Sequence, residues 1–158
     1  MAYGVIDKRS RCYYTYLADI FSALKDKQKD YNWLITDCEI AAHSDELDKL
    51  NFGMYHFING DELTRLVEKD NSQWICGVLC GFDKNISLDT ILEYNIPSLE
   101  NPALWEKEIK MLHPRSSIDI IPFDSSFVII HSVTKDIIEL IRKSFPECED
   151  LQVYNSKK

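Results

Sequence analysis

The stretch SQWICGVLCGFD, residues 72–83, decides the fold because it is apolar on both faces when drawn as an extended chain. In a β-strand, successive side chains point to opposite faces. One face would carry Trp74, Cys76, Val78, Cys80 and Phe82, and the other Ile75 and Leu79. Gly77 and Gly81 fall on the second face, where they would let a helix approach closely. A strand covered on both faces lies inside a sheet with a layer on each side, so we expect this strand at the centre.

Hydrophobic periodicity on both sides of this segment predicts an alternation of strands and helices. Further strands are expected at residues 2–7, 31–40, 53–58 and 151–154, and two more within 117–133. Helices are expected at residues 11–28, 87–94, 101–112 and 134–145, after Asn59, and as a short acidic turn after Ser44. The alternation has no strict βαβ period. It predicts one α/β domain over residues 1–158, with a mixed sheet of about five to six strands and flanking helices.

Single residues place the boundaries of several elements. Asn59 with Glu62 three residues later is typical of a helix N-cap, and Asn101 before a proline indicates another helix start. Asp124-Ser125 suits a turn between two strands, and Pro122 suggests that the first of them lies near a sheet edge. The stripe in the first helix consists of Tyr13, Leu17, Ile20, Phe21 and Leu24.

The composition predicts a soluble, cytoplasmic protein. Of 158 residues, 45% are apolar, which is enough for a core without disulfide or metal staples. The start lacks the apolar run of a secretion signal, and no apolar stretch approaches the roughly 20 residues of a membrane span. Five cysteines at irregular spacing make a poor disulfide framework and are expected to be structural.

Charge is unevenly distributed along the chain, which carries a formal net charge of −8. Residues 1–30 hold six basic and four acidic side chains, whereas residues 31–70 hold three basic and nine acidic ones. Nucleic acid would be repelled by such a surface, so direct DNA or RNA binding is disfavoured. A basic protein partner would be attracted and steered.

The segment LITDCEIAAHSDE, residues 34–46, carries the most suggestive side chains for catalysis. Cys38 lies between Asp37 and Glu39, and His43 follows. A nucleophilic thiol needs a lowered pKa, whereas adjacent carboxylates raise it. We therefore interpret this segment as a strand that leads into an acidic surface and assign no catalytic residue to it.

Metal and cofactor sites are not predicted either. In a strand, Cys76 and Cys80 are roughly 13 Å apart, too far for a disulfide or for sharing one tetrahedral metal. The four histidines form no metal-binding or nucleophile motif, and no glycine-rich phosphate loop is present. The carboxylates near helix caps favour partner binding instead. The residues expected to bind a partner are Asp45, Glu46, Asp48, Tyr55, Asp61 and Glu62.

The acidic 37–70 region, the aromatic residues and the lack of a catalytic motif resemble the immunity proteins of bacterial contact-dependent growth inhibition. The aromatic residues concerned are Trp33, Tyr55, Trp74 and Trp105. The resemblance implies a partner: the C-terminal domain of a cognate toxin, whose active site or docking surface is blocked. Many such toxins are basic nucleases that attack tRNA, and some associate with elongation factor Tu. A complex that includes this factor is therefore implied too.

Two alternatives stay open from the sequence. One is a small hydrolase-like enzyme with a dispersed site that uses His56 or His131 with a carboxylate. The other is a regulatory or scaffold module that binds a partner other than a toxin. If the acidic region does not meet the partner, the expected helix at residues 101–112 with Trp105 is the next candidate surface.

Overall fold

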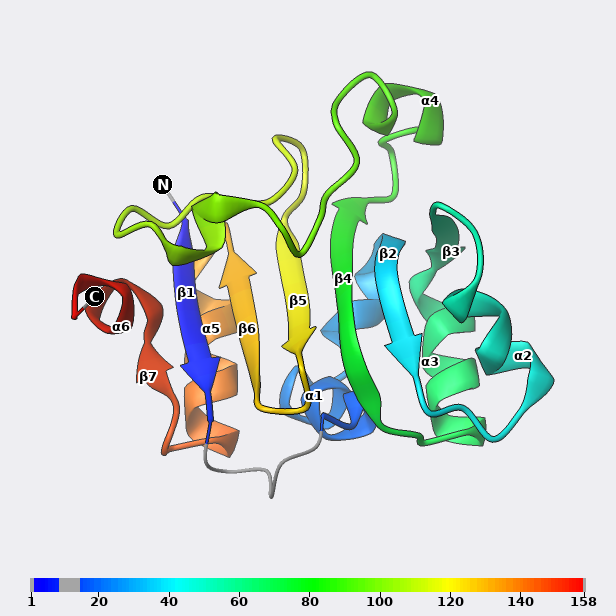
Figure 1. The fold of residues 1–158 in the computed structure, drawn as a ribbon, viewed down its shortest axis with the longest axis horizontal. Coiled ribbons are helices and arrows are strands. Elements are labelled where there is room, and N and C mark those ends of the chain that lie inside the picture. The colour runs from blue at the N-terminus through cyan, green and yellow to red at the C-terminus, as the bar shows by residue number, and fades with distance from the viewer. Residues whose placement is uncertain (1, 9–14, 158) are drawn as a thin grey trace.

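One antiparallel sheet forms the centre of the computed structural model, which describes residues 2–8 and 15–157 (Figure 1). Among these residues it has seven strands, in the order β3-β2-β4-β5-β6-β1-β7. The strands are β1 (Tyr3–Asp7), β2 (Tyr31–Ile40), β3 (His56–Asn59), β4 (Trp74–Asp83), β5 (Ile118–Phe123), β6 (Phe127–Ser132) and β7 (Glu149–Asp150). The predicted α/β fold with flanking helices is confirmed. The sheet has more strands than expected, and every pairing between the described strands is antiparallel instead of mixed.

The described α-helices are α1 (Leu17–Ala23), α2 (Asp45–Asp48), α3 (Gly60–Lys69), α4 (Leu88–Ile91), α5 (Lys135–Ser144) and α6 (Leu151–Ser156). Three short 3-10 turns are η1 (Lys27–Asp30), η2 (Lys49–Asn51) and η3 (Pro102–Trp105). Helices α1, α3 and α5 lie on one face of the sheet, and on the other face the mostly irregular segment between β4 and β5 crosses near one end of the strands (Figure 1). The first core packs α1, α3 and α5 against the sheet, and the second packs residues 86–112 and α6 against it.

Strand β4 is internal, as predicted, and pairs with β2 on one side and with β5 on the other. Its Leu79 belongs to the core under the helices, whereas Val78 and Phe82 belong to the second core. Trp74 lies in the first core with Leu79, opposite to its expected face. The reason is a bulge: β4 uses one more residue than β2 between Cys76 and Trp74, which shifts the alternation.

The two glycines of β4 have different surroundings, and no helix is the close neighbour of either. A Cβ on Gly81 would lie 2.6 Å from Ile118 and 3.2 Å from the Trp33 indole, because these side chains stand on the strands to either side. A Cβ on Gly77 would make only ordinary contacts, at 3.7 Å or more. Gly81 is therefore the position that admits a bulky neighbour, namely the fully buried Trp33.

Three expected elements differ in the structure. The helix expected at 11–28 begins at Leu17 and is interrupted after Ala23; Tyr13 and Cys12 lie outside the described residues. The expected strand 151–154 is helical instead, because the Asp150 carboxylate accepts a hydrogen bond from Val153 N and caps α6. Pro122 lies in an internal strand, beyond the residues of β5 that pair with β4.

The prediction of a helix at residues 101–112 was also wrong, because only the short turn η3 forms there. Asn101 does cap a first turn, with its Oδ1 accepting from Ala103 N at 3.0 Å. The turn ends at Trp105, and the next residue is extended. Asn155 of α6 donates from Nδ2 to the carbonyls of Leu104 and Glu106, at 3.1 and 2.8 Å. This tertiary contact satisfies the carbonyl groups that a longer helix would have used.

We predict that Gly81→Ala lowers the free energy of unfolding by about 1–3 kcal/mol, because the new methyl group overpacks the space between Trp33 and Ile118. The matched variant Gly77→Ala should change stability by less than about 1 kcal/mol, since its methyl group has room. Urea unfolding of both variants checks this. Equal destabilisation by the two substitutions would contradict the packing described here.

Candidate partner-binding surface

Helices α2 and α3 lie side by side at the β3 end of the sheet (Figure 1). Both begin at the caps that the sequence predicts. Ser44 Oγ accepts from Leu47 N at 3.2 Å, and Asn59 Oδ1 accepts from Glu62 N at 2.8 Å. Leu47 of α2 and Leu63 of α3 are fully buried in the first core, so the acidic residues of both helices are left on the outer side.

Two of the predicted partner-binding carboxylates already have basic partners within the chain. Glu46 accepts from Arg65 at 2.8 Å and from Lys69 at 2.9 Å, and Glu62 accepts from Arg65 at 2.6 Å. These hydrogen bonds hold the pKa of Glu46 at about 2 and lower that of Glu62. Glu46 therefore ties α2 to α3, Glu62 holds Arg65 from within α3, and the negative charge of both residues is largely compensated.

The other predicted carboxylates are more available. Asp45 and Asp61 are exposed and make no ion pair with any described residue. Asp48 is half-buried and accepts from Asn51 Nδ2 at 2.9 Å. Asn51 also bonds the backbone of Ile40, through its Oδ1 at 2.7 Å and its Nδ2 at 3.0 Å. Asp48 thus helps to fix the end of β2 and keeps only part of its surface for a partner.

Two exposed apolar side chains extend this surface, and they were missed by the sequence reasoning. Phe52 and Met54 are 66% and 75% exposed in the loop between η2 and β3. Gly53 between them has φ +90°, a conformation that suits glycine, and the His56 ring bonds Phe52 O. The expected strand 53–58 begins only at His56, which leaves Met54 in the loop; the available signal was two large apolar residues on either side of Gly53. Tyr55 is half-buried against the second core.

We call Asp45, Asp48, Phe52, Met54 and Asp61 the α2–α3 surface. It combines carboxylates of α2 and of the first turn of α3 with two exposed apolar side chains in the loop between η2 and β3. Charge steers an approaching partner and sets its register, while buried apolar anchors supply much of the affinity. The arrangement therefore has both components that a protein-binding surface needs.

The aromatic residues considered earlier have structural positions. Trp33 and Trp74 are 0% and 1% exposed and belong to the first core. Trp105 packs edge-on against Phe123 and Phe127, with ring centroids 5.6 and 5.8 Å apart. Trp33 and Trp74 are therefore not available as anchors, and Trp105 is half-buried, which leaves the loop with Phe52 and Met54 as the more exposed apolar contact.

A histidine–carboxylate pair exists, but it is enclosed. His131 Nδ1 lies 2.9 Å from Asp119 Oδ2, and the two side chains are 1% and 0% exposed. Asp119 also accepts from Leu112 N and Ser116 Oγ, both at 2.9 Å. The carboxylate thereby holds the irregular layer onto β5. A substrate has no route to this pair in the folded chain, so we interpret it as structural.

The pKa values of the four described cysteines, Cys38, Cys76, Cys80 and Cys148, are all raised, which opposes thiolate formation. Burial, and then the neighbouring Cys76, raise the pKa of the Cys38 thiol far above its usual value. The flanking carboxylates, the expected cause, act instead on Cys76, where Glu39 and Asp37 add to the effect of burial. Within residues 2–8 and 15–157, no three His, Cys, Asp or Glu side chains are grouped to hold a metal ion.

Comparisons give no relatives from which a role could be transferred: no protein-family model, curated protein or solved structure matches the chain. The α2–α3 surface therefore has to be interpreted from its own geometry.

None of the described helices has the length and apolar character needed to cross a bilayer.

One buried carboxylate supports the surface from below. Asp70, which is 8% exposed, accepts from the backbone N–H groups of His43 and Ser44 at 3.0 and 2.7 Å, and from the Ser72 hydroxyl. Burial raises the pKa of Asp70, but these hydrogen bonds outweigh it and hold the pKa at about 2. Asp70 thus fixes the segment that leads into α2.

We predict a specific acid sensitivity from Asp70. Its folded pKa of about 2 lies below the ordinary 3.8, so its contribution is complete above pH 4 and is lost as the pH falls towards 2. Between pH 5 and 2, the unfolding free energy should fall by about 2 kcal/mol more in the wild type than in Asp70→Asn. Urea titrations at several pH values measure this, with the exposed Asp61→Asn as the control. If Asp70→Asn keeps the wild-type pH dependence, the network does not stabilise the fold.

Proposed function

We propose that this chain is an immunity-type protein that acts in the cytoplasm by binding and neutralising a basic toxin domain. The observation that carries the proposal is the α2–α3 surface, in which Phe52 and Met54 are exposed beside uncompensated carboxylates. Single exposed apolar residues are ordinary. Two in one short loop, which follows the acidic helix α2 in the chain, favour contact with a protein.

The charge of the surface suggests the class of toxin. An enzyme that cleaves tRNA or another RNA must bind a polyanion, and basic side chains therefore surround its active site. A carboxylate-bearing surface can occupy the same region and exclude the substrate. The inhibitor could equally cover the docking surface through which the toxin reaches its target, including a complex with elongation factor Tu. Direct nucleic-acid binding by the chain itself does not fit its net charge of −8.

The direct test is protection of growing cells. Each candidate toxin, meaning the C-terminal domain of a large secreted protein whose gene neighbours that of this chain in its genome, is expressed with and without the chain. The proposal expects growth arrest by the domain alone and growth when the chain is present. In the same assay, Phe52→Ser with Met54→Ser should lose protection while the unfolding free energy changes by less than about 0.5 kcal/mol per site, as is usual for exposed positions.

The matched control exchanges two exposed apolar residues elsewhere, Val133→Ser with Val153→Ser, which are 42% and 55% exposed. This variant should protect as well as the wild type. Full protection by the Phe52 and Met54 double variant would move the binding site away from the loop. Equal arrest with and without the wild-type chain would refute the proposed function for that toxin.

We also predict a charge effect on the kinetics of binding. Asp45→Asn with Asp61→Asn should slow association with the toxin domain by roughly threefold to tenfold at low ionic strength, with a weaker salt dependence. Glu46 and Glu62 are left intact because Glu46 holds α2 to α3 through Arg65 and Lys69, and Glu62 positions Arg65. The control, Glu139→Gln with Glu147→Gln, removes two exposed charges on and after α5. Stopped-flow rates that are equal for the two double variants would contradict steering by the α2–α3 surface.

A further inference from the structure

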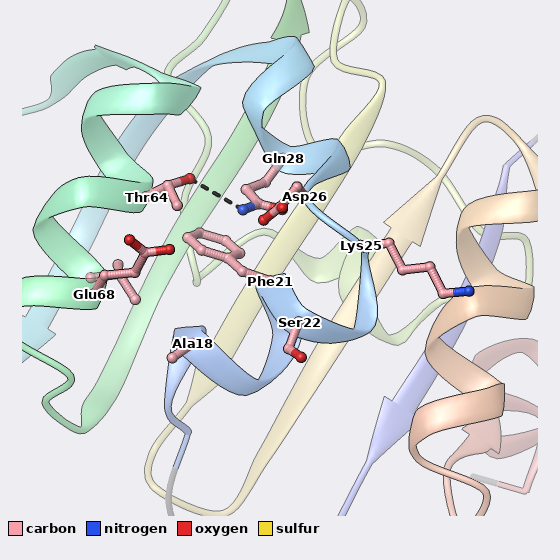
Figure 2. A pocket seen from close by; sticks show the side chains of 9 residues that line it. Ala18, Phe21, Ser22, Lys25, Asp26, Gln28, Thr64 and Glu68 are labelled. Carbon is pink, nitrogen blue, oxygen red and sulfur yellow. Dashed lines mark hydrogen bonds between the residues drawn. The ribbon is translucent and has the colours of Figure 1, made fainter.

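A pocket of about 280 Å³ opens between α1, η1 and α3, on the helical side of the sheet (Figure 2). Its apolar wall is formed by Ala18, Phe21 and Val67. Its polar lining comes from Ser22, Lys25, Asp26, Gln28, Thr64 and Glu68. None of these residues belongs to the α2–α3 surface, so the pocket is a separate feature of the molecule.

Gln28 gives the pocket a buried hydrogen-bond acceptor. The residue is 0% exposed, and its Nε2 donates to Thr64 Oγ1 at 3.1 Å (Figure 2). The Thr64 hydroxyl in turn donates to Gly60 O at 2.7 Å, so its oxygen can only accept from Gln28. These two hydrogen bonds determine the orientation of the Gln28 amide, whose Nε2 faces Thr64. The other amide atom, Oε1, is buried and has no hydrogen-bond partner among the described residues.

The position of Gln28 is rigidly determined by the fold. Its backbone carbonyl accepts from Trp33 Nε1 at 2.9 Å, which joins η1 to the central packing. Helix α3 approaches η1 so closely that a Cβ on Gly60 would lie 2.3 Å from Gln28 O. These contacts hold η1 against β2 and α3. A buried carbonyl without a hydrogen-bond donor destabilises the folded chain, unless a donor from a bound molecule reaches it.

Two carboxylates, of Asp26 and Glu68, line the same space, and Asp26 Oδ1 lies 3.9 Å from the ammonium of the half-buried Lys29. In Figure 2 the carboxylates of Asp26 and Glu68 are turned towards Phe21 and Gln28, whereas the Lys25 side chain extends away from them. Lys25 and Asp26 both have positive φ, 53° and 66°. Such a pair of non-glycine residues costs conformational energy, and here it forms the turn that places the Asp26 carboxylate at the pocket and Lys25 outside it.

From this geometry we propose that the pocket binds a primary alkylammonium group. The three N–H bonds of the ammonium satisfy Gln28 Oε1 and the carboxylates of Asp26 and Glu68, and its alkyl stem lies along Phe21. The ammonium can belong to a free diamine or to a lysine side chain of another protein. Both sources share this chemistry, and binding here does not depend on the proposed toxin partner.

Calorimetric titration of the full chain tests the proposal, with n-butylammonium as the first probe. Saturable binding at one site is expected, with NMR shifts concentrated on the Gln28 side-chain amide. Tetramethylammonium has the charge but no N–H donor. It should bind at least about tenfold more weakly, because losing one charge-assisted hydrogen bond has an effect of that size. Equal binding of the two cations would show a nonspecific counter-ion and overturn the proposal.

Two further probes separate the sources of the group. Tighter binding of 1,5-diaminopentane than of Nα-acetyl-lysine N-methylamide assigns the pocket to free amines, and the reverse order assigns it to a lysine side chain. Either order supports alkylammonium recognition. No saturable binding of any primary amine contradicts it.

Variants of the chain provide a second test of alkylammonium binding. Glu68→Gln, at an exposed position of α3, should weaken n-butylammonium binding about tenfold. Gln28→Met, which keeps the length but removes the acceptor, should abolish saturable binding, with folding checked by unfolding curves. The control Glu147→Gln makes the same charge change elsewhere and should leave binding unchanged. Wild-type affinity in Glu68→Gln would overturn the proposal even if Gln28→Met does not fold.

Discussion

The packing of Trp33 over Gly81 is the contact on which the remaining structure depends. The indole of β2 occupies the space that a side chain on β4 would otherwise fill, and its Nε1 donates to the backbone of η1. That turn is in close contact with α3 at Gly60 and is linked to it again through Gln28 and Thr64. Arg65 and Lys69 of α3 then bind Glu46 of α2. A continuous set of contacts therefore leads from the centre of the sheet to the proposed binding surface.

The opposite face of the sheet is stabilised differently. The chain that covers this face is mostly irregular, so the backbone groups of that chain need hydrogen-bond partners that a helix would otherwise supply. Asp119 accepts three hydrogen bonds from that layer and from His131. His113 bonds Ile91 O through Nε2 and accepts from Arg115 N at Nδ1, and burial lowers its pKa, which keeps the ring neutral. His131, a catalytic candidate in the sequence, and its partner Asp119 thus hold loops in place, as His113 does.

The parts of the fold that were predictable depend on local patterns. The strand at 72–83 and the caps at Ser44 and Asn59 follow from alternation and from side-chain chemistry within a few residues. The errors arose where a distant contact decided the outcome. Asn155 satisfies the carbonyls of Leu104 and Glu106 and replaces an expected helix, and a bulge moves Trp74 to the other core.

The candidate site was predicted only in part, for a similar reason. Counting charges identified the acidic region but not the basic residues, Arg65 and Lys69, that compensate Glu46 and Glu62 in three dimensions. The exposure of Phe52 and Met54 was also not predicted, because apolar residues are normally expected to be buried. The structure shifts emphasis from the number of carboxylates to the combination of a few available ones with an exposed apolar loop.

The central claim is that the α2–α3 surface is where this chain meets its partner. Hydrogen–deuterium exchange, measured on the chain alone and in complex with the toxin domain, tests it most directly because it reports backbone protection segment by segment. The account predicts slower exchange on binding within residues 44–62, with residues 84–117 unchanged. Protection confined to residues 84–117, with residues 44–62 exchanging as in the unbound chain, would contradict it.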